Sequence, residues 1–567
     1  MKSLSFLLSA VFVLSSVTCL HAVNARQGVL SVRQPDGSSL QVMMAGNECG
    51  HLVYDLQGRL MVSDEQGFYV YPDADTESEV ILAVNKNLER QTAVRRGAPG
   101  LMTTFFPSTG ENHALVVLVE FADNEFTVPD PGDFYNRMLN EAGYSQDDAS
   151  GSARDYFIEN SSGVFSPIFD VYGPVKLDRD MEYYGKNDRW GNDSNPQQMA
   201  IDACAKLDSE IDFRIYDTNG DNIIDNVFFY YAGYGEADGG GANTIWPHST
   251  RLSLIGKTVE YDGVRLDRYA CSNELQRMIN PDVPDGIGTF CHEFCHVLGL
   301  PDLYATSTIN LTTPGIWDLM DNGSYNNMGK TPPNLSSYER YALGWLTPDP
   351  LRYNDYSLLP LSESNRAIIH EGSTPNEYFL FENRQQKGFD AYLPNHGMLV
   401  WHIDYRKSVW DSNTVNDNIW HQCVDLVEAD NNSDLNTKSG DSFPGSANVT
   451  KFTKWTSPSF SFWDYSDINI GIWHIRESTE GTISFSALPL SYVEPEEDEE
   501  ESSVGSVYEA VLPFRVDGNC VSGLEGILEI FDIGGKKVRT LPAGCSVVLP
   551  KGLYLAVKDG FRYKILI

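Results

Sequence analysis

The sequence has 567 residues, too many for one hydrophobic core, because single domains rarely exceed about 250–300 residues. Hydrophobic residues make up 41%, so several folded units can bury cores. The formal net charge of −38 argues against nucleic acid and anionic membrane surfaces as partners. It suits an extracellular protein, although solubility alone accounts for most of it.

Residues 1–25 have the order of a signal peptide: Lys2, an apolar run over residues 4–20, and then small residues before the cleavage point. Cleavage is expected after Ala25, or alternatively after Ala22. No later run is apolar and long enough to span a bilayer. The sequence therefore predicts an exported protein with no membrane span.

Residues 26–96 are predicted to form a β-rich propeptide. Alternating side chains at 68–71 and a Pro-Asp-Gly turn at 35–37 indicate short strands. Arg95 and Arg96 precede a Gly- and Pro-containing stretch, which is a natural site for proteolytic nicking. A small N-terminal β domain on a linker is the alternative.

Residues 97–350 have a mixed α/β pattern. Apolar runs at 114–121 and 227–231 predict buried strands, and a helix is expected to begin near Gly288. Short strands predominate afterwards, so residues 351–488 are predicted to form a β-rich domain.

An acidic linker is predicted at 489–503, because a block of like charges with Pro and Ser cannot bury a core. Residues 504–567 contain short strands and Gly turns, which indicate a small β-sandwich. Cys520 and Cys545 in this tail are the favoured disulfide pair among the nine cysteines.

The segment from His292 to His296 predicts a catalytic zinc site. Histidines four residues apart lie on one face of a helix, about 5–6 Å apart at Cβ, where both can bind one zinc ion. Glu293 stands beside the first histidine and is expected to act as general base on a zinc-activated water.

Gly299 is expected to end this helix in a left-handed turn, so that Asp302 returns towards the metal as third ligand. An ordinary polar turn residue is the alternative for Asp302. Cys291 and Cys295 lie off the histidine face, so packing is expected rather than a Cys/His zinc site. Cys49 is a candidate thiolate for blocking the zinc of the precursor, although packing as a small hydrophobe is favoured.

Residues 217–225 have the pattern of the first part of an EF-hand-like calcium loop. Position twelve is Phe228, so further ligands must come from elsewhere, with Glu236 and Asp238 as candidates. An Asx-rich turn is the alternative. The residues at positions one, three, five, seven and nine are Asp217, Asn219, Asp221, Ile223 and Asp225.

The run from His292 to Tyr304 resembles the immune inhibitor A-like metallopeptidases, which are metzincin-like. The resemblance covers roughly residues 30–485 and departs from the family at Cys295, where a small residue is usual. It implies a metzincin-like α/β catalytic domain, zinc ligation by Asp302, and calcium in the acidic loop. Residues 315–325 resemble the family's Met-turn, in which Met320 would form an apolar floor beneath the zinc ligands. Further matching segments are 335–345, 397–404 and 424–430.

Residues 528–555 and the closing strand at 563–567 resemble the sorting domain of type IX secretion cargo. This resemblance implies passage through the type IX secretion machinery to the extracellular space or the outer-membrane surface. A small β-sandwich binding module is the alternative.

The motifs together predict a secreted zinc-dependent endopeptidase that hydrolyses extracellular proteins. The competing hypothesis is a catalytically inactive, peptidase-like adhesin or binding protein that keeps zinc for structure. An inactive relative would most readily lose the general base, and Glu293 is present.

Overall fold

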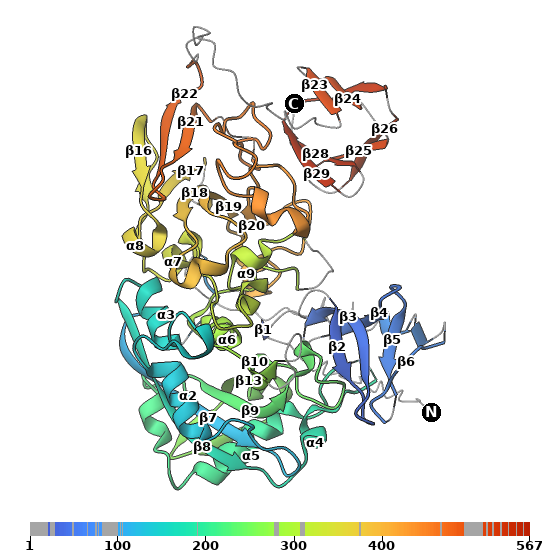
Figure 1. Cartoon of the computed structure of the whole chain (residues 1–567), viewed down its shortest axis with the longest axis vertical. Helices are drawn as coiled ribbons and strands as arrows, with labels where there is room; N and C mark the ends of the chain where they lie inside the picture. Colours follow the sequence, from blue (N-terminus) through green and yellow to red (C-terminus); the bar gives the residue numbers. More distant parts are fainter. Residues whose placement is uncertain are drawn as a thin grey trace, which may run out of the picture.

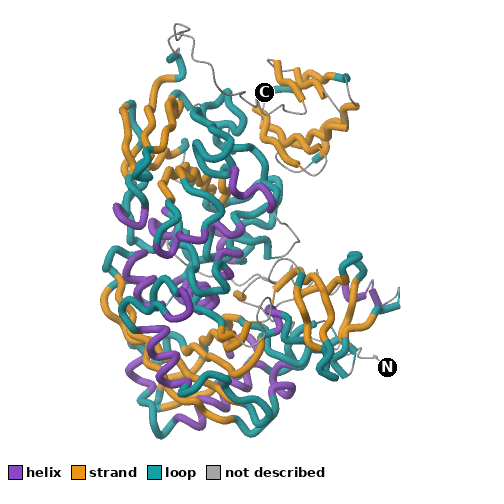
Figure 2. Tube along the Cα trace, viewed as in Figure 1, coloured by secondary structure: helices purple, strands orange, loops and turns teal. Residues whose placement is uncertain are grey.

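The chain folds into a mixed α/β structure with several separate sheets, seen in the computed structural model of Figure 1. Helices are concentrated in its central part, whereas the N-terminal and C-terminal lobes consist mostly of strands (Figure 2). The structure describes residues 21–22, 29–47, 50–64, 66–73, 76–77, 79–81, 100–102, 104, 106–189, 191–276, 283–306, 312–373, 376–464, 466, 468–492, 514–517, 520–523, 527–532, 536–542, 544–551, 553–558 and 561–566.

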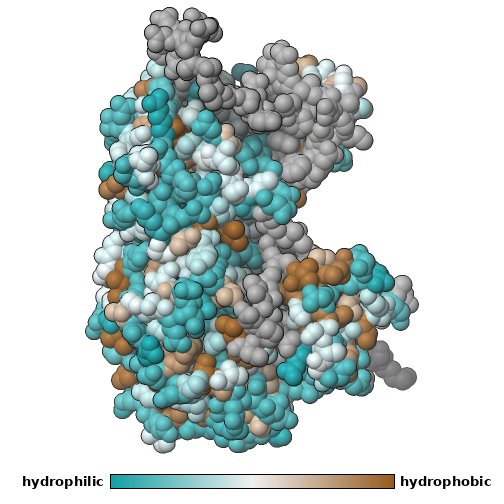
Figure 3. All heavy atoms as spheres, viewed as in Figure 1, coloured by the Kyte–Doolittle hydropathy of each residue, from teal (hydrophilic) through white to brown (hydrophobic). Residues whose placement is uncertain are grey.

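Several predictions concern parts of the chain outside these residues. They are most of the signal peptide, the cleavage site at Arg95 and Arg96, the thiol of Cys49, and most of the acidic linker. None of the helices in the described part of the chain has the length and apolarity needed to cross a bilayer. Hydrophilic residues prevail on the face shown in Figure 3, in keeping with the net charge of −38.

A mixed sheet forms the centre of the α/β part. Four neighbouring strands run parallel, β13, β9, β7 and β8, and β10 joins β13 antiparallel near the other edge. Strand β14 (Val283–Pro284) pairs with β13 off this path. The spatial order is β1 (His21–Ala22), β10 (His248–Arg251), β13 (Arg268–Gln276), β9 (Val227–Tyr234), β7 (Gly110–Glu120) and β8 (Phe165–Lys176).

Both faces of this sheet are buried. Side chains on a strand point alternately to its two faces, and those of β7 belong alternately to two hydrophobic clusters. In β7, Val116 and Leu118 belong to one hydrophobic cluster, and Val117 and Val119 belong to another. The first cluster includes residues of helices α2 (Pro131–Asn140), α3 (Ala153–Asn160) and α6 (Gly288–Leu298); the second includes residues of α4 (Met181–Gly185) and α5 (Pro196–Leu207). The predicted buried strands and the helix beginning at Gly288 are thus confirmed.

An antiparallel N-terminal sheet lies against the α/β part (Figure 1). Its apolar face shares one cluster with Ala237, Ala242 and Trp246, which precede β10 in the chain. Its strands, in order, are β2 (Leu30–Arg33), β3 (Ser39–Asn47), β4 (Gly50–Asp55), β5 (Leu60–Ser63) and β6 (Tyr69–Val70).

Two further sheets follow residue 348. Leu380, Leu399 and Trp401 of these sheets belong to the same cluster as the core of α6, so the chain packs continuously across residue 350. One sheet has the order β15 (Asp349–Pro350), β17 (Ile368–Glu371), β18 (Glu377–Arg384), β19 (Gly397–Asp404) and β20 (Val424–Leu426); the other has β16 (Asn354–Leu358), β22 (Ile483–Pro489) and β21 (Ile470–Glu477).

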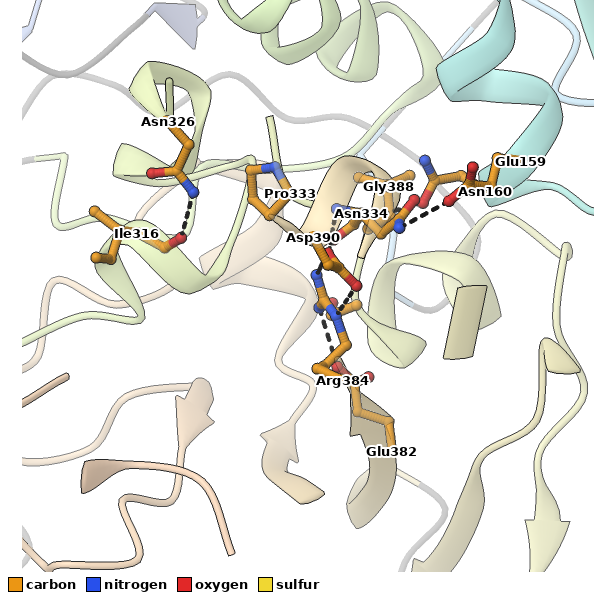
Figure 4. A network of polar contacts seen from close by, with 12 residues as sticks. Glu159, Asn160, Ile316, Asn326, Pro333, Asn334, Glu382, Arg384, Gly388 and Asp390 are labelled. Atoms are coloured by element: carbon orange, nitrogen blue, oxygen red, sulfur yellow. Dashed lines mark hydrogen bonds and ion pairs between the residues drawn. The ribbon is translucent and has the colours of Figure 1, made fainter. Parts of the chain in front are cut away.

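A buried polar network joins α3 to this second group of sheets (Figure 4). Arg384 at the end of β18 donates to Asp390 over 2.9 Å, to Glu382 over 3.2 Å and to the Asn334 carbonyl over 2.8 Å. The Asn334 amide donates to Glu159 of α3 over 3.0 Å. Because the guanidinium is fully buried, each of its partners is needed to offset its desolvation.

The C-terminal strands form two small sheets over their own apolar cluster. The predicted disulfide between Cys520 and Cys545 is wrong, since both are free thiols. Cys520 pairs with Val548, so Cys545 lies three positions further along the ladder, about 10 Å away. The strands are β23 (Phe514–Asp517), β24 (Cys520–Gly523), β25 (Ile527–Asp532), β26 (Lys537–Pro542), β27 (Ser546–Val548), β28 (Leu553–Lys558) and β29 (Phe561–Leu566).

Candidate metal centre

Helix α6 presents two different faces. Phe290, Phe294 and Leu298, spaced four residues apart, lie in the hydrophobic cluster beneath the central sheet. His292 and His296 are also four apart and buried, and their rings approach to 4.8 Å between centroids. Apolar packing on one side of the helix therefore holds both imidazoles on another.

The helix begins and ends at glycines that the packing requires. A Cβ on Gly288 would lie 1.8 Å from the Ser324 carbonyl oxygen, so only glycine fits there. Gly299 has φ +102 and donates to the His296 carbonyl, which confirms the predicted left-handed end of the helix. The reversal brings Asp302 back to the imidazoles.

Each imidazole is oriented through its Nδ1 atom. His292 Nδ1 lies 2.8 Å from the Leu319 carbonyl oxygen, and His296 Nδ1 lies 2.8 Å from that of Leu300. A carbonyl only accepts, so each Nδ1 carries the proton and each Nε2 presents a lone pair. This is the tautomer that binds a metal through Nε2.

His292, His296 and Asp302 form a triangle of ligand atoms. The two Nε2 atoms lie 3.2 Å apart, and Asp302 Oδ1 lies 3.2 Å from each of them. Ligands about 2.0–2.1 Å from a tetrahedral zinc lie about 3.3–3.4 Å from one another, so the spacing fits zinc. Asp302 Oδ1 is buried and accepts no hydrogen bond. Three lone pairs facing one another without a proton are suited to a cation.

Electrostatics keep these groups in metal-binding form. Burial opposes ionisation of Asp302, but the two imidazoles beside its carboxylate outweigh burial and lower its pKa to about 2. Burial lowers the pKa of His296, although Asp302 opposes this change. The aspartate is therefore ionised and His296 favours the neutral ring.

Glu293 is buried next to His292 and is not part of the three-residue group. Cys291 and Cys295 lie in the hydrophobic cluster, where burial raises the pKa of both thiols, so they pack as expected. Met320 is fully buried in the same cluster.

The acidic loop at 217–225 turns its side chains onto its own backbone. Asp217 accepts from the N–H groups of Asp221 and Asn222, and Asp221 accepts from that of Ile223, at 2.9–3.0 Å. Asp225 is 1% exposed, and its Oδ1 has no hydrogen-bond partner. Among the described residues, the ligand atoms of the histidine–aspartate triangle all lie within 4.8 Å of one another, whereas the carboxylates of this loop do not form such a group.

Glu236, considered above as a calcium ligand, instead faces the N-terminal sheet. Its carboxylate lies 3.2 Å from His51 Nε2 and accepts from Tyr69 at 3.2 Å and Asn187 at 2.6 Å. Sequence reasoning missed this contact, and it missed Asn413, which contacts Asp302 from 111 residues away. No spacing pattern links such distant residues.

The part of the chain that contains this site is similar to known peptidases. Residues 108–346 match the family described as immune inhibitor A peptidase M6, catalytic domain. Over 266 residues the chain is 27% identical to the pre-pro-metalloprotease PrtV of Vibrio cholerae serotype O1, covering 41% of this chain and 28% of PrtV. Over 281 residues it is 27% identical to immune inhibitor A of Bacillus thuringiensis subsp. alesti, covering 42% of this chain and 40% of that protein.

The family resemblance is therefore confirmed for residues 108–346, which match the peptidase M6 catalytic domain. The chain matches less than half the length of either relative, with shares of 28% and 40%.

Proposed function

We propose that the chain is a zinc-dependent endopeptidase whose zinc is held by His292, His296 and Asp302. The observation that carries the proposal is the triangle of three buried donor atoms with sides of 3.2 Å. Zinc bound there would lower the pKa of a water molecule towards about 7 and polarise the peptide carbonyl. The peptidase M6 match over residues 108–346 supports the same reaction.

Glu293 is proposed as the general base. It follows His292 on α6, so its carboxylate is on the helix that carries both imidazoles. It would take the proton of the attacking water and pass it to the amine of the departing peptide. A binding protein that kept zinc only for structure would not need this carboxylate. We therefore favour the enzyme over the inactive alternative.

Glu293→Gln tests the base, because glutamine has the same shape and cannot take the proton. We expect zinc content close to that of the wild type and hydrolysis of casein or a quenched peptide lowered about 10²–10⁴-fold. The exposed Glu210→Gln serves as control. Hydrolysis by Glu293→Gln at the wild-type rate would refute the assigned base.

Calcium binding at 217–225 remains a proposal. Its support is the carboxylate oxygen of Asp225, which is buried without a hydrogen bond amid other oxygen-bearing side chains. Calcium bound to the folded state would raise the melting temperature. We expect this rise in wild type and not in Asp225→Asn. If millimolar calcium did not raise the melting temperature of the wild type, we would assign the loop as an Asx-rich turn that binds no calcium.

Export is proposed in two steps, by the signal peptide at 1–25 and by residues 504–567 as a type IX sorting domain, with extracellular proteins as substrates. The N-terminal sheet is proposed to act as a propeptide. Its buried contacts with the α/β part through Glu236 support a role that depends on staying attached until cleavage.

A further inference from the structure

Asp302 is held by a residue from the loop between β19 and β20, in the part of the chain that follows residue 350. Asn413, which follows helix α9 (Lys407–Asp411), donates through Nδ2 to Asp302 Oδ2 over 2.5 Å. Its Oδ1 accepts from the backbone N–H of Asp302 over 2.9 Å. Two hydrogen bonds thus join one side chain to both the carboxylate and the backbone of the third member of the triangle.

This contact is part of a wider attachment between two loops. The Thr306 hydroxyl donates to the Asn413 carbonyl over 2.6 Å, and the Asn416 amide donates to the Leu303 carbonyl over 2.8 Å. Asn416 also exchanges hydrogen bonds with Val424 of β20, at 2.8 and 3.0 Å. The loop that carries Asn413 is therefore anchored to strand β20, so it is not free to move together with Asp302.

The geometry divides the two carboxylate oxygens between two tasks. Oδ2 is occupied by Asn413, whereas Oδ1 points to both imidazole Nε2 atoms at 3.2 Å. Without the amide contact, the carboxylate can rotate in the metal-free protein. Metal binding then has to remove this freedom, at a cost in conformational entropy. Partners that orient a metal ligand commonly change metal affinity when they are removed.

We propose that Asn413 is a positioning residue for the metal site. It holds Asp302 so that Oδ1 faces zinc, and it thereby makes the part of the chain after residue 350 necessary for tight zinc binding. The inference rests on the proposed zinc site and extends it beyond residue 350. Residues 97–350 alone would retain all three ligands and lack the amide that orients one of them.

Asn413 has φ 53, a conformation that favours Asn and Gly, so Asn413→Gly removes the side chain without adding backbone strain. Asn448→Gly is the matched control, because Asn448 has φ 51, is exposed and lies in the same part of the chain. Asn413→Ser gives a second variant should the glycine variant be unstable. Zinc affinity is measured on the full chain by competition with a chromophoric chelator.

We expect Asn413→Gly to weaken zinc binding about 10–100-fold and Asn448→Gly to leave it unchanged. In an Asp302→Ala background, Asn413→Gly should have no further effect, because its effect passes through Asp302. The melting temperature of the metal-free proteins shows separately whether the fold is kept.

Zinc affinity of Asn413→Gly equal to that of the wild type would overturn the proposal. The proposal would also be overturned if Asn413→Gly weakened zinc binding equally in the Asp302→Ala background. The effect would then come from a general destabilisation of the structure and not from Asp302. If His292→Ala bound zinc as tightly as the wild type, the metal site itself, and the proposed function with it, would be wrong.

Discussion

The backbone N–H of Leu303 donates to the Met320 carbonyl over 2.8 Å. Leu303 follows Asp302, and Met320 follows Leu319, whose carbonyl orients His292. The loop that carries the carboxylate and the turn that orients the first imidazole are therefore joined directly. Displacement of either segment is expected to change the spacing of all three donor atoms.

Met320 is expected to support this junction by packing. Replacing a fully buried methionine with alanine costs about 2–5 kcal/mol, so Met320→Ala should lower the melting temperature and weaken zinc binding. Met320→Leu, which nearly conserves volume, should cost less than about 1.5 kcal/mol. Thermal unfolding with and without zinc measures both effects. If Met320→Ala had the melting temperature and zinc binding of the wild type, Met320 would not support the site.

Zinc removal should destabilise the protein, because a ligand that binds only the folded state raises its stability. A chelator is expected to lower the melting temperature and abolish hydrolysis, with recovery on adding zinc. His292→Ala, His296→Ala and Asp302→Ala should each lower zinc content, measured by elemental analysis. Full metal and full activity in Asp302→Ala would mean that the third ligand lies elsewhere.

Latency is expected to depend on His51. His51→Ala removes the imidazole 3.2 Å from the buried Glu236 carboxylate, which keeps its hydrogen bonds from Tyr69 and Asn187, and should weaken the contact between the N-terminal sheet and the α/β part by about 1–3 kcal/mol. The variant precursor should be more active before cleavage near Arg95 and Arg96 than the wild-type precursor. Activity of both is measured before and after limited proteolysis.

The exposed-surface change His113→Ala is the matched control, since His113 lies half-exposed on β7. A His51→Ala precursor as latent as the wild type would show that this contact does not hold the sheet. A Cys49→Ala precursor that stays fully latent would likewise remove the thiolate model and leave steric blocking.

Glu377 is expected to make stability fall as pH rises. Burial raises the pKa of its carboxyl from 4.5 to about 7, with the charges of Asp404 and Asp464 adding to the effect. The folded state therefore binds more protons than the unfolded state between these values, and stability is lost as pH passes from about 4.5 to 7. The change is of the order of 3 kcal/mol.

Glu377→Gln should flatten this part of the melting-temperature profile, because glutamine does not titrate. The exposed Glu210→Gln should leave the profile unchanged. A Glu377→Gln profile parallel to that of the wild type would mean that Glu377 is charged in the folded state.

The C-terminal lobe is expected to be dispensable for catalysis and necessary for export. Its strands have their own apolar cluster, although the Phe531 ring stacks on Trp420 at 4.5 Å. Deleting residues 504–567 should keep peptide hydrolysis and retain the enzyme in the periplasm. Normal amounts in the medium would refute the sorting role, and an unfolded product would show that the lobe is part of the catalytic fold.

Local patterns in the sequence were sufficient for α6 and its glycine end. Helical periodicity places His292 and His296 on one face, and Gly299 adopts φ +102 because only glycine does so at little cost. Continuous apolar runs likewise predicted β7 and β9 as buried strands. Each of these features depends on residues within about one helical turn or one strand of one another.

Tertiary structure alone decided which distant groups meet. Asn413 reaches Asp302 across 111 residues, and His51 reaches Glu236 from another sheet. Strand register likewise kept Cys520 and Cys545 apart, although their spacing allowed a pair. A hydrogen bond between remote segments leaves no periodic trace in the sequence, because its geometry is set by how whole sheets and helices pack.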